Sequence, residues 1–164
     1  MPTSDQGVDQ ARYTLVPRTL IFLTRGANVL LLHGTAHKRL WPNLYNGIGG
    51  HVEPGEDLQS SAEREINEET GLQTSGLRLY GTITVDTGQN PGVCIFVFKG
   101  EALPGDPKPT PEGALEWVPM GQVSRLPLVE DLYQWLPRLF TMTSNDPPFA
   151  LHIRYDADGK IIVK

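Results

Sequence analysis

Seven acidic side chains gather between Glu53 and Glu69, and Arg64 is the only basic residue among them. Glu65, Glu68 and Glu69 have the spacing i, i+3, i+4, which places three carboxylates on one arc of a helix. Carboxylates this close repel each other. A hard divalent cation such as Mg²⁺ removes the repulsion, because it prefers oxygen ligands and is commonly shared with substrate phosphates. The spacing therefore predicts either a metal-binding helix edge or an ordinary solvated acidic face in which Arg64 pairs with Glu68.

A glycine-rich stretch leads into this acidic segment. Gly47-Ile48-Gly49-Gly50 comes first, and Glu53-Pro54-Gly55-Glu56 then has the composition of a turn into a helix. Glycine lets the backbone approach a ligand closely and expose its carbonyl oxygens. A loop carbonyl beside helix carboxylates would make a plausible cage for a metal ion.

The carboxylates share one arc only if their segment is helical. The sequence predicts a helix over 57–70, with Gly71 as its C-terminal stop. Leu58, Ala62 and Ile66 fall at i, i+4 and i+8, which forms an apolar stripe beside the carboxylates. One flank of the helix can therefore pack on a sheet while the acidic residues line its edge.

Apolar alternation and turn residues predict a sheet around this helix. Strands are expected over 13–24 (broken early by Pro17), 28–32, 77–85, 93–98, 115–119, 149–155 and 160–163. Loops are expected over 34–50, 86–92 and 101–113, and a second helix over 129–141 that Pro137 should end or kink. Strands mixed with two separate helices indicate an α/β fold with a mixed β-sheet covered by helices.

Size and composition indicate one globular domain. The chain has 164 residues, of which 39% are hydrophobic and 20% are charged. Residues 1–10 lack apolar periodicity and are expected to be a disordered tail, so the domain is expected over 11–164.

The same composition excludes several classes of protein. No apolar run reaches the ~20 residues of a membrane span, and no secretion signal is visible. Cys94 is the only cysteine, so an internal disulfide is impossible and the cytoplasm is the default location. The formal charge of −5 argues against binding duplex nucleic acid through a basic surface.

The segment from Gly50 to Leu72 resembles the Nudix box, which is Gly, five residues, Glu, seven residues, then Arg-Glu-apolar-any-Glu-Glu-any-Gly-apolar. Every defined place is filled, by Gly50, Glu56, Arg64, Glu65, Ile66, Glu68, Glu69, Gly71 and Leu72. The resemblance implies an α/β/α sandwich with a mixed sheet. It also implies an enzyme that hydrolyses a nucleoside diphosphate linked to another group.

The resemblance also implies roles for individual residues. Glu65, Glu68 and Glu69 would bind Mg²⁺, for which Mn²⁺ can substitute, and Gly49 would offer its backbone carbonyl. Glu56 and Arg64 would orient these carboxylates, since loosely held ligands lose affinity and rate. Glu112 is a further candidate ligand, because similar enzymes often add an acidic residue from a loop. Either Glu65 or Glu68 could be the general base that takes the proton of the attacking water.

The loop over 41–50 resembles the MutT-like subgroup, which removes oxidised purine nucleoside triphosphates. This resemblance implies that Asn46 contacts the purine edge, because an amide presents a donor and an acceptor together. A tight turn at Asn46-Gly47 is the alternative explanation of the same residues.

The segment around Glu130 and Asp131 resembles a helix start at which the subgroup reads the base with an acidic pair. Leu128 or Val129 stands where the subgroup has a tryptophan that stacks on the base, and this departure puts a preference for 8-oxo-purines in doubt. The acidic pair can alternatively stabilise a helix N-terminus through its dipole.

Three basic or titratable side chains are candidates for phosphate contact. His51 follows the box glycine, where MutT-like enzymes often have lysine, and histidine is mostly neutral near pH 7. Lys38 and Arg39 lie in the preceding loop and could also bind phosphate, or they could be unspecific surface cations.

The resemblance as a whole predicts Mg²⁺-dependent hydrolysis of a nucleoside triphosphate, with an ordinary or an oxidised purine base, to a monophosphate and pyrophosphate. The alternatives are a Nudix hydrolase of ADP-ribose, a nucleotide sugar or a dinucleoside polyphosphate, a non-catalytic nucleotide-binding module, and a metal-free acidic domain. The expected partner is a small nucleotide, not a duplex or a membrane, and the protein is expected to be a monomer or a homodimer.

Overall fold

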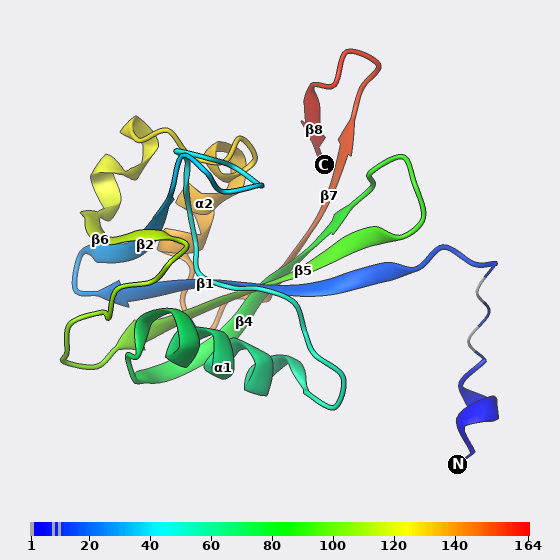
Figure 1. Ribbon diagram of the computed structural model, residues 1–164, viewed down its shortest axis with the longest axis horizontal. Helices are drawn as coiled ribbons and strands as arrows, with labels where there is room; N and C mark the ends of the chain where they lie inside the picture. The colour runs from blue at the N-terminus through cyan, green and yellow to red at the C-terminus, as the bar shows by residue number, and fades with distance from the viewer. Residues whose placement is uncertain (1, 8, 10) are drawn as a thin grey trace.

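The computed structural model describes every residue except 1, 8 and 10. These three lie within the tail predicted over 1–10, so that part of the prediction falls outside the described residues. Thr3–Gln6 forms a short 3-10 helix, η1, set apart from the body of the molecule (Figure 1). No helix of the described part is long and apolar enough to span a membrane.

The body is built on one mixed β-sheet. Its strands are β1 (Leu15–Arg25), β2 (Asn28–Gly34), β3 (Tyr45–Asn46), β4 (Thr74–Val85), β5 (Gly92–Ala102), β6 (Gly113–Pro119), β7 (Phe149–Tyr155) and β8 (Ile161–Val163). They lie in the order β3-β2-β1-β5-β4-β7-β8, and β6 also pairs with β2. The β1–β5 and β4–β7 pairs are parallel, and the other strand pairs are antiparallel.

Alternation along β1 divides the core between the two faces of the sheet. Phe22 points into one apolar cluster, whereas its neighbours Ile21 and Leu23 point into the other. Helix α1 (Leu58–Thr70) covers the second cluster and helix α2 (Leu132–Thr141) covers the first, on opposite sides of the strands (Figure 1). The predicted sandwich of a mixed sheet between helices is therefore confirmed.

Helix α1 begins and ends as its sequence predicts. The Asp57 side chain caps the first turn by accepting a hydrogen bond from the Ser60 backbone N–H at 2.9 Å. Gly71 ends the helix with φ of 68°, a left-handed conformation that glycine adopts without steric cost. Ala62 and Ile66 are buried against the sheet, and the flank of the helix beside them carries the carboxylates.

Pro17 does not break β1 and Pro137 does not end α2, contrary to the prediction, while a kink at Pro137 stays a prediction. Strand β1 is not broken at Pro17, because the Pro17 carbonyl accepts from the Val52 N–H at 3.2 Å, on the side of β1 away from the β5 ladder. A strand residue's N–H and C=O point to the same side, so Pro17 removes no donor from the pairing with β5. Helix α2 does not end at Pro137, because its buried apolar face, including Leu136 and Leu139, continues past it.

Several element boundaries also differ from the prediction. Strand β5 runs to Ala102, inside the predicted loop over 101–113, because it pairs with β4 as far as Thr74. Helix α2 starts at Leu132 and not at Val129, because the Val129 N–H donates to the Tyr45 carbonyl at 3.1 Å. A 3-10 helix, η2 (Met120–Arg125), was not predicted.

Candidate active site

The carboxylate edge consists of Glu65, Glu68 and Glu69 of α1. It lies against the loop over residues 47–51, called the glycine loop below. A Cβ atom on Gly50 would stand only 2.5 Å from Glu65 Oε1, so the absence of a side chain at this position lets the helix approach the loop. Glu65 and Glu69 are each only 8% exposed, whereas Glu68 is exposed. The loop therefore buries two of the three carboxylates and leaves the third at the surface.

Arg64 holds the neighbouring carboxylates in place. Its Nε donates to Glu56 Oε1 at 2.6 Å, and its Nη1 donates to Glu65 Oε1 at 2.8 Å and to Glu68 Oε2 at 3.1 Å. Its Nη2 donates to Glu56 Oε2 at 3.1 Å and to the His51 carbonyl at 3.0 Å. One guanidinium thus connects the turn before α1, the helix and the glycine loop, and it holds the pKa of Glu56 below its usual range.

Glu69 is a buried carboxyl group that lacks a positive partner within the described part of the chain. Its Oε2 is buried and has no hydrogen-bond partner among the described residues. Burial, followed by repulsion from Glu112 and Glu65, raises the pKa of Glu69 to about 8, although Lys38 and the Gly49 backbone act in the opposite direction. Burial likewise raises the pKa of Glu65, against the pull of Arg64. A buried carboxylate without a partner is costly, so this edge lacks a positive charge.

Glu112 is close enough to the edge to raise the pKa of both Glu65 and Glu69. Its Oε2 also accepts from Lys38 Nζ at 2.6 Å. Glu112, the predicted loop ligand, is therefore paired with Lys38, one of the predicted phosphate contacts. Lys38 belongs to the loop between β2 and β3.

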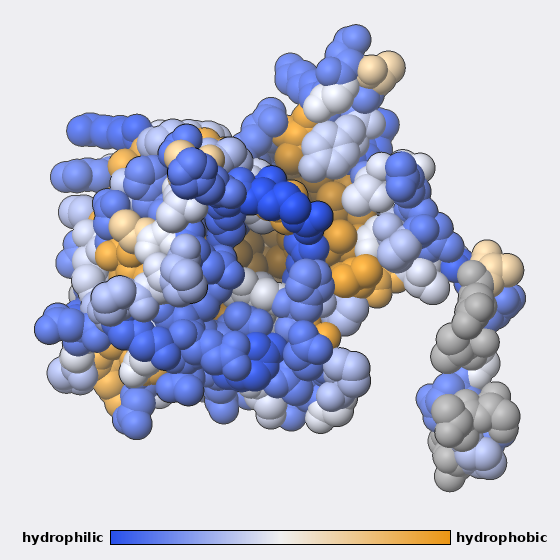
Figure 2. Space-filling model, viewed as in Figure 1, coloured by the Kyte–Doolittle hydropathy of each residue, from blue (hydrophilic) through white to orange (hydrophobic). Residues whose placement is uncertain are grey.

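An open cleft of about 490 Å³ begins beside the glycine loop and extends over the α2 face of the sheet. Its mouth is lined by Gly49, Gly50, Glu112 and the candidate phosphate contacts Lys38, Arg39 and His51. Its interior is mostly apolar, with walls that include Leu20, Leu44, Val85, Val93, Ile95, Leu132 and Ile153. Figure 2 shows the hollow with apolar side chains on its floor and polar side chains around its rim. A flat apolar group with a polar edge suits such a space.

Residues 14–139 match the model of the NUDIX domain family. The chain belongs to the Nudix family. It is 29% identical over 145 residues to the oxidized purine nucleoside triphosphate hydrolase of Mus musculus, which covers 88% of this chain and 89% of that protein. The protein of the same name from Danio rerio is 27% identical over 120 residues, covering 73% and 76% respectively. The structure of a mutator MutT protein from Bacillus halodurans is similar, with a TM-score of 0.68 and 25% identity over 92% of this chain and 97% of that chain.

Family membership makes the chain a hydrolase that acts on nucleotide substrates. Nudix hydrolases generally need a divalent metal, typically Mg²⁺. The residues here fit such an ion, because the donors are hard carboxylate oxygens and Glu69 Oε2 is buried without a partner. Within the described residues, no three His, Cys, Asp or Glu side chains are grouped to hold a metal as they stand. Arg64 bonds only Oε1 of Glu65 and Oε2 of Glu68, so the other oxygen of each carboxylate would be left to hold an ion.

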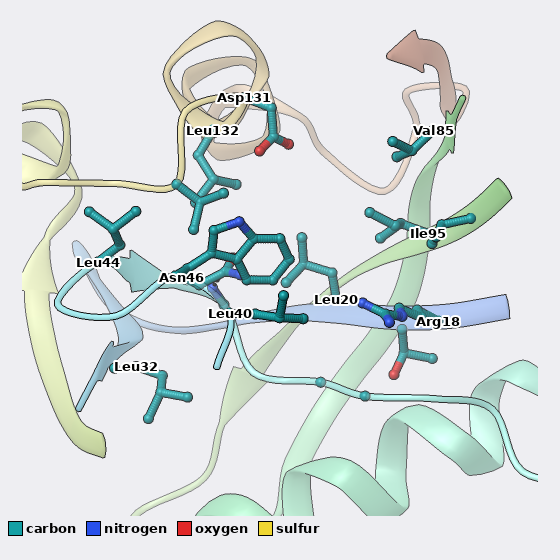
Figure 3. A pocket seen from close by; sticks show the side chains of 18 of the residues that line it. Arg18, Leu20, Leu32, Leu40, Leu44, Asn46, Val85, Ile95, Asp131 and Leu132 are labelled. Atoms are coloured by element: carbon teal, nitrogen blue, oxygen red, sulfur yellow. Dashed lines mark hydrogen bonds between the residues drawn. The ribbon is translucent and has the colours of Figure 1, made fainter. Parts of the chain in front are cut away.

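Two residues predicted to contact the base of a Nudix substrate line the cleft. Asn46 Oδ1 accepts from the Gly47 N–H at 2.8 Å, so the side chain makes the local turn contact and also faces the cleft. Asp131 lies at the start of α2, but its side chain does not cap that helix. Its Oδ2 instead accepts from Trp135 Nε1 at 2.8 Å, and burial raises its pKa. Figure 3 shows Asn46 and Asp131 on different walls of the cleft.

Glu130, the other member of the predicted acidic pair, is exposed and does not line the cleft. The pair is thus divided, with one carboxylate facing the cleft and the other facing solvent. Arg18, which lines the cleft from β1, was not among the predicted site residues. The sequence did contain an indication that Arg18 has a function. It is a cation between apolar residues of a predicted strand, and a charged residue on the buried face of a strand needs a partner.

Proposed function

We propose that this Nudix hydrolase converts purine nucleoside triphosphates to the monophosphate and pyrophosphate, with Mg²⁺ as its metal and Mn²⁺ as a substitute. One observation carries the proposal: a single cleft joins a mouth lined by Glu112 and candidate phosphate contacts to an apolar interior with an amide and a carboxyl group. A triphosphate fits this division, because its base is flat and apolar with a polar edge while its phosphates need positive charge.

Glu65, Glu68 and Glu69, with Glu112 and the Gly49 carbonyl, are the groups that would hold the metal. The Gly49 carbonyl accepts no hydrogen bond within the described part of the chain. When bound, the metal would neutralise phosphate charge and lower the pKa of the attacking water. Phosphoryl transfer depends chiefly on positioning and electrostatic stabilisation, which are the tasks of these side chains.

Either Glu65 or Glu68 would take the proton of the attacking water. Arg64 bonds both carboxylates, so it fixes their direction without entering the reaction. Glu56 in turn fixes Arg64 through two hydrogen bonds, to Nε and to Nη2. We therefore assign Arg64 and Glu56 to positioning and the helix glutamates to catalysis.

The cleft interior would bind the base. The Asn46 amide group and the Asp131 carboxyl group would bond its edge, while Leu20, Val85 and Leu132 would pack on its faces. At the mouth, His51 and Arg39 would contact the phosphates. Lys38 would do so only after it exchanges Glu112 for a phosphate oxygen.

Turnover of a substrate panel tests the proposal. The panel holds GTP, ATP, the pyrimidine triphosphates and 8-oxo-dGTP, together with ADP-ribose, a nucleotide sugar and a dinucleoside polyphosphate. Each is incubated with Mg²⁺ or Mn²⁺, and pyrophosphate, phosphate and nucleotide products are quantified. Release of monophosphate and pyrophosphate from purine triphosphates is the expected result. A panel in which only diphosphate-linked compounds react would overturn the choice of substrate, and no turnover at all would overturn the enzymatic role.

A further inference from the structure

Arg18 lies on the floor of the cleft, on the strand that passes beneath it. Across the sheet it stands level with Ile95 of β5 on one side and with His51 of the glycine loop on the other. Its face of β1 is that of Leu20 and Phe22, which is the face covered by α2. Figure 3 shows Arg18 beside Ile95, across the cleft from Asp131.

The guanidinium of Arg18 has no partner. Its Nε is buried without a hydrogen bond, and in the described part of the chain its side chain makes neither a hydrogen bond nor an ion pair. Arg64, in contrast, is bonded by three carboxylates and a backbone carbonyl. A guanidinium always carries its charge and has five N–H donors, and the buried Nε–H of Arg18 has left water without gaining an acceptor, which costs free energy. An acceptor that arrives with the substrate would remove this cost.

On the β5 side, the surroundings of Arg18 favour a base over a phosphate as that acceptor, whereas His51, a candidate phosphate contact, stands on its other side. Ile95 flanks it on the sheet, and Val93 and Val85 continue the apolar wall beyond. A strongly hydrated phosphate gains little against such a wall, whereas the face of a nucleobase packs on it. The donors of Arg18 would then meet the edge of that base.

We propose that Arg18 selects 6-oxopurine bases by donating hydrogen bonds to their adjacent O6 and N7 acceptors. This rests on the proposed function and names the substrate class of the same site. Guanine and hypoxanthine present two acceptors side by side, which a planar guanidinium can bond together. Adenine presents N7 next to the N6 amino group, a donor, so Arg18 would face it with one donor opposed to another. Arg18 is thus a specificity-determining residue.

Kinetics with three bases tests this. The specificity constant kcat/KM is measured for GTP, ITP and ATP with the wild type, Arg18→Met, Arg18→Lys and the control Arg78→Met, an exposed arginine of β4 away from the cleft. ITP is included because it keeps O6 and N7 but lacks the 2-amino group. We expect Arg18→Met to lower kcat/KM for GTP and ITP roughly ten- to a hundredfold and for ATP by less than about threefold. Arg18→Lys should restore only part of the loss, and the control should change none of the three values.

Two kinetic results would overturn the assignment. An equal loss for all three nucleotides would mean that Arg18 contacts phosphate or ribose, and unchanged GTP to ATP selectivity with a lower melting temperature would mean that it only supports the fold. Calorimetric binding of GMP, IMP and AMP separates this proposal from the proposed function, because it needs no turnover. If no triphosphate is hydrolysed, tighter binding of GMP and IMP than of AMP that depends on Arg18 still upholds the assignment. Binding of GMP no tighter than AMP, or of neither, overturns it.

Discussion

The carboxylate edge comes from a single turn and a half of one helix, whereas the cleft is assembled from strands, a loop and a second helix that are far apart in the sequence. At the edge, negative charges are crowded, and Arg64 compensates only some of them. In the interior of the cleft, charged side chains are few, and Arg18 has no partner among the described side chains. The edge therefore lacks positive charge, whereas the cleft floor carries a positive charge that lacks an acceptor.

We propose that this difference separates the residues of the reaction from those that select the substrate. Glu65, Glu68 and Glu69 face the place where a cation and phosphates would lie, and these are common to every nucleotide. Asn46, Asp131 and Arg18 line the apolar interior, where nucleotides differ. Changes at the edge should therefore affect all substrates alike, and changes in the cleft should affect them unequally. The following predictions test that division.

Removal of one charge from the edge should have the largest effect. We expect Glu65→Gln, Glu68→Gln or Glu69→Gln to lower kcat by about a hundredfold or more on every substrate, because each loses a metal ligand or the general base. Steady-state kinetics at saturating Mg²⁺ measures this. Glu63→Gln is the matched control, since Glu63 is exposed on the same helix and bonds only Gln59. A loss below tenfold in all three variants would refute the assignment of the edge.

The edge could be predicted from sequence because its geometry is local. Helical spacing alone puts Glu65, Glu68 and Glu69 on one arc, and Asp57 and Gly71 mark the ends of the helix. The box pattern then identified Arg64 as their neighbour, and its contacts are those of a positioning residue. The mixed sheet between two helices was also predictable, because apolar alternation and turns define strands without knowledge of their partners.

The cleft could be predicted only in part because its geometry is long-range. Arg18 meets Ile95 and His51 through strand pairing, which no spacing along the chain reveals. Glu130 and Asp131 are adjacent in sequence, yet only the second faces the cleft. The start of α2 was misplaced for the same reason, since the contact between Val129 and Tyr45 joins distant segments.

The second largest effect should come from a substitution in the glycine loop, because this loop lies very close to the carboxylate edge. In Gly50→Ala, the new Cβ would stand 2.5 Å from Glu65 Oε1 and must displace that carboxylate. We expect kcat to fall by about tenfold or more on all substrates, by the sensitivity of catalysis to small displacements. Gly121→Ala is the control, because nothing lies near its Cβ position. Equal kinetics for the two variants would show that Glu65 has room to move without loss.

The charge deficit at the edge should appear in the pH dependence of stability. Glu69 has a pKa of about 8 in the folded chain and an ordinary value of 4.5 when unfolded. Between these values the folded chain keeps a proton that the unfolded chain has released, so stability without metal should fall as pH rises through this window. Melting temperatures in EDTA should thus decrease from pH 5 to pH 8 by a few degrees, and Mn²⁺ should restore them at pH 8 but not at pH 5.

Glu69→Gln is the decisive variant for that measurement. It removes the titrating group but keeps the size of the side chain, so its melting temperature should change less between pH 5 and pH 8 and respond less to Mn²⁺. A wild-type protein whose metal-free stability rises over this range would contradict the placement of Glu69 as a buried, unpartnered carboxyl group.

The smallest of these effects on turnover should come from Asp131 in the cleft and should depend on the base. Asp131→Asn keeps an oxygen that can accept from Trp135 Nε1 but turns the other position into a donor, so packing is preserved while one hydrogen-bonding group is reversed. We expect kcat/KM to fall about five- to tenfold for the preferred purine triphosphate, mainly through KM, and to change less for pyrimidine triphosphates. Glu130→Gln, the exposed neighbour, should change neither value. A uniform fall in kcat on all substrates would mean that Asp131 acts with the carboxylate edge, and the division between reaction and selection would then fail at this residue.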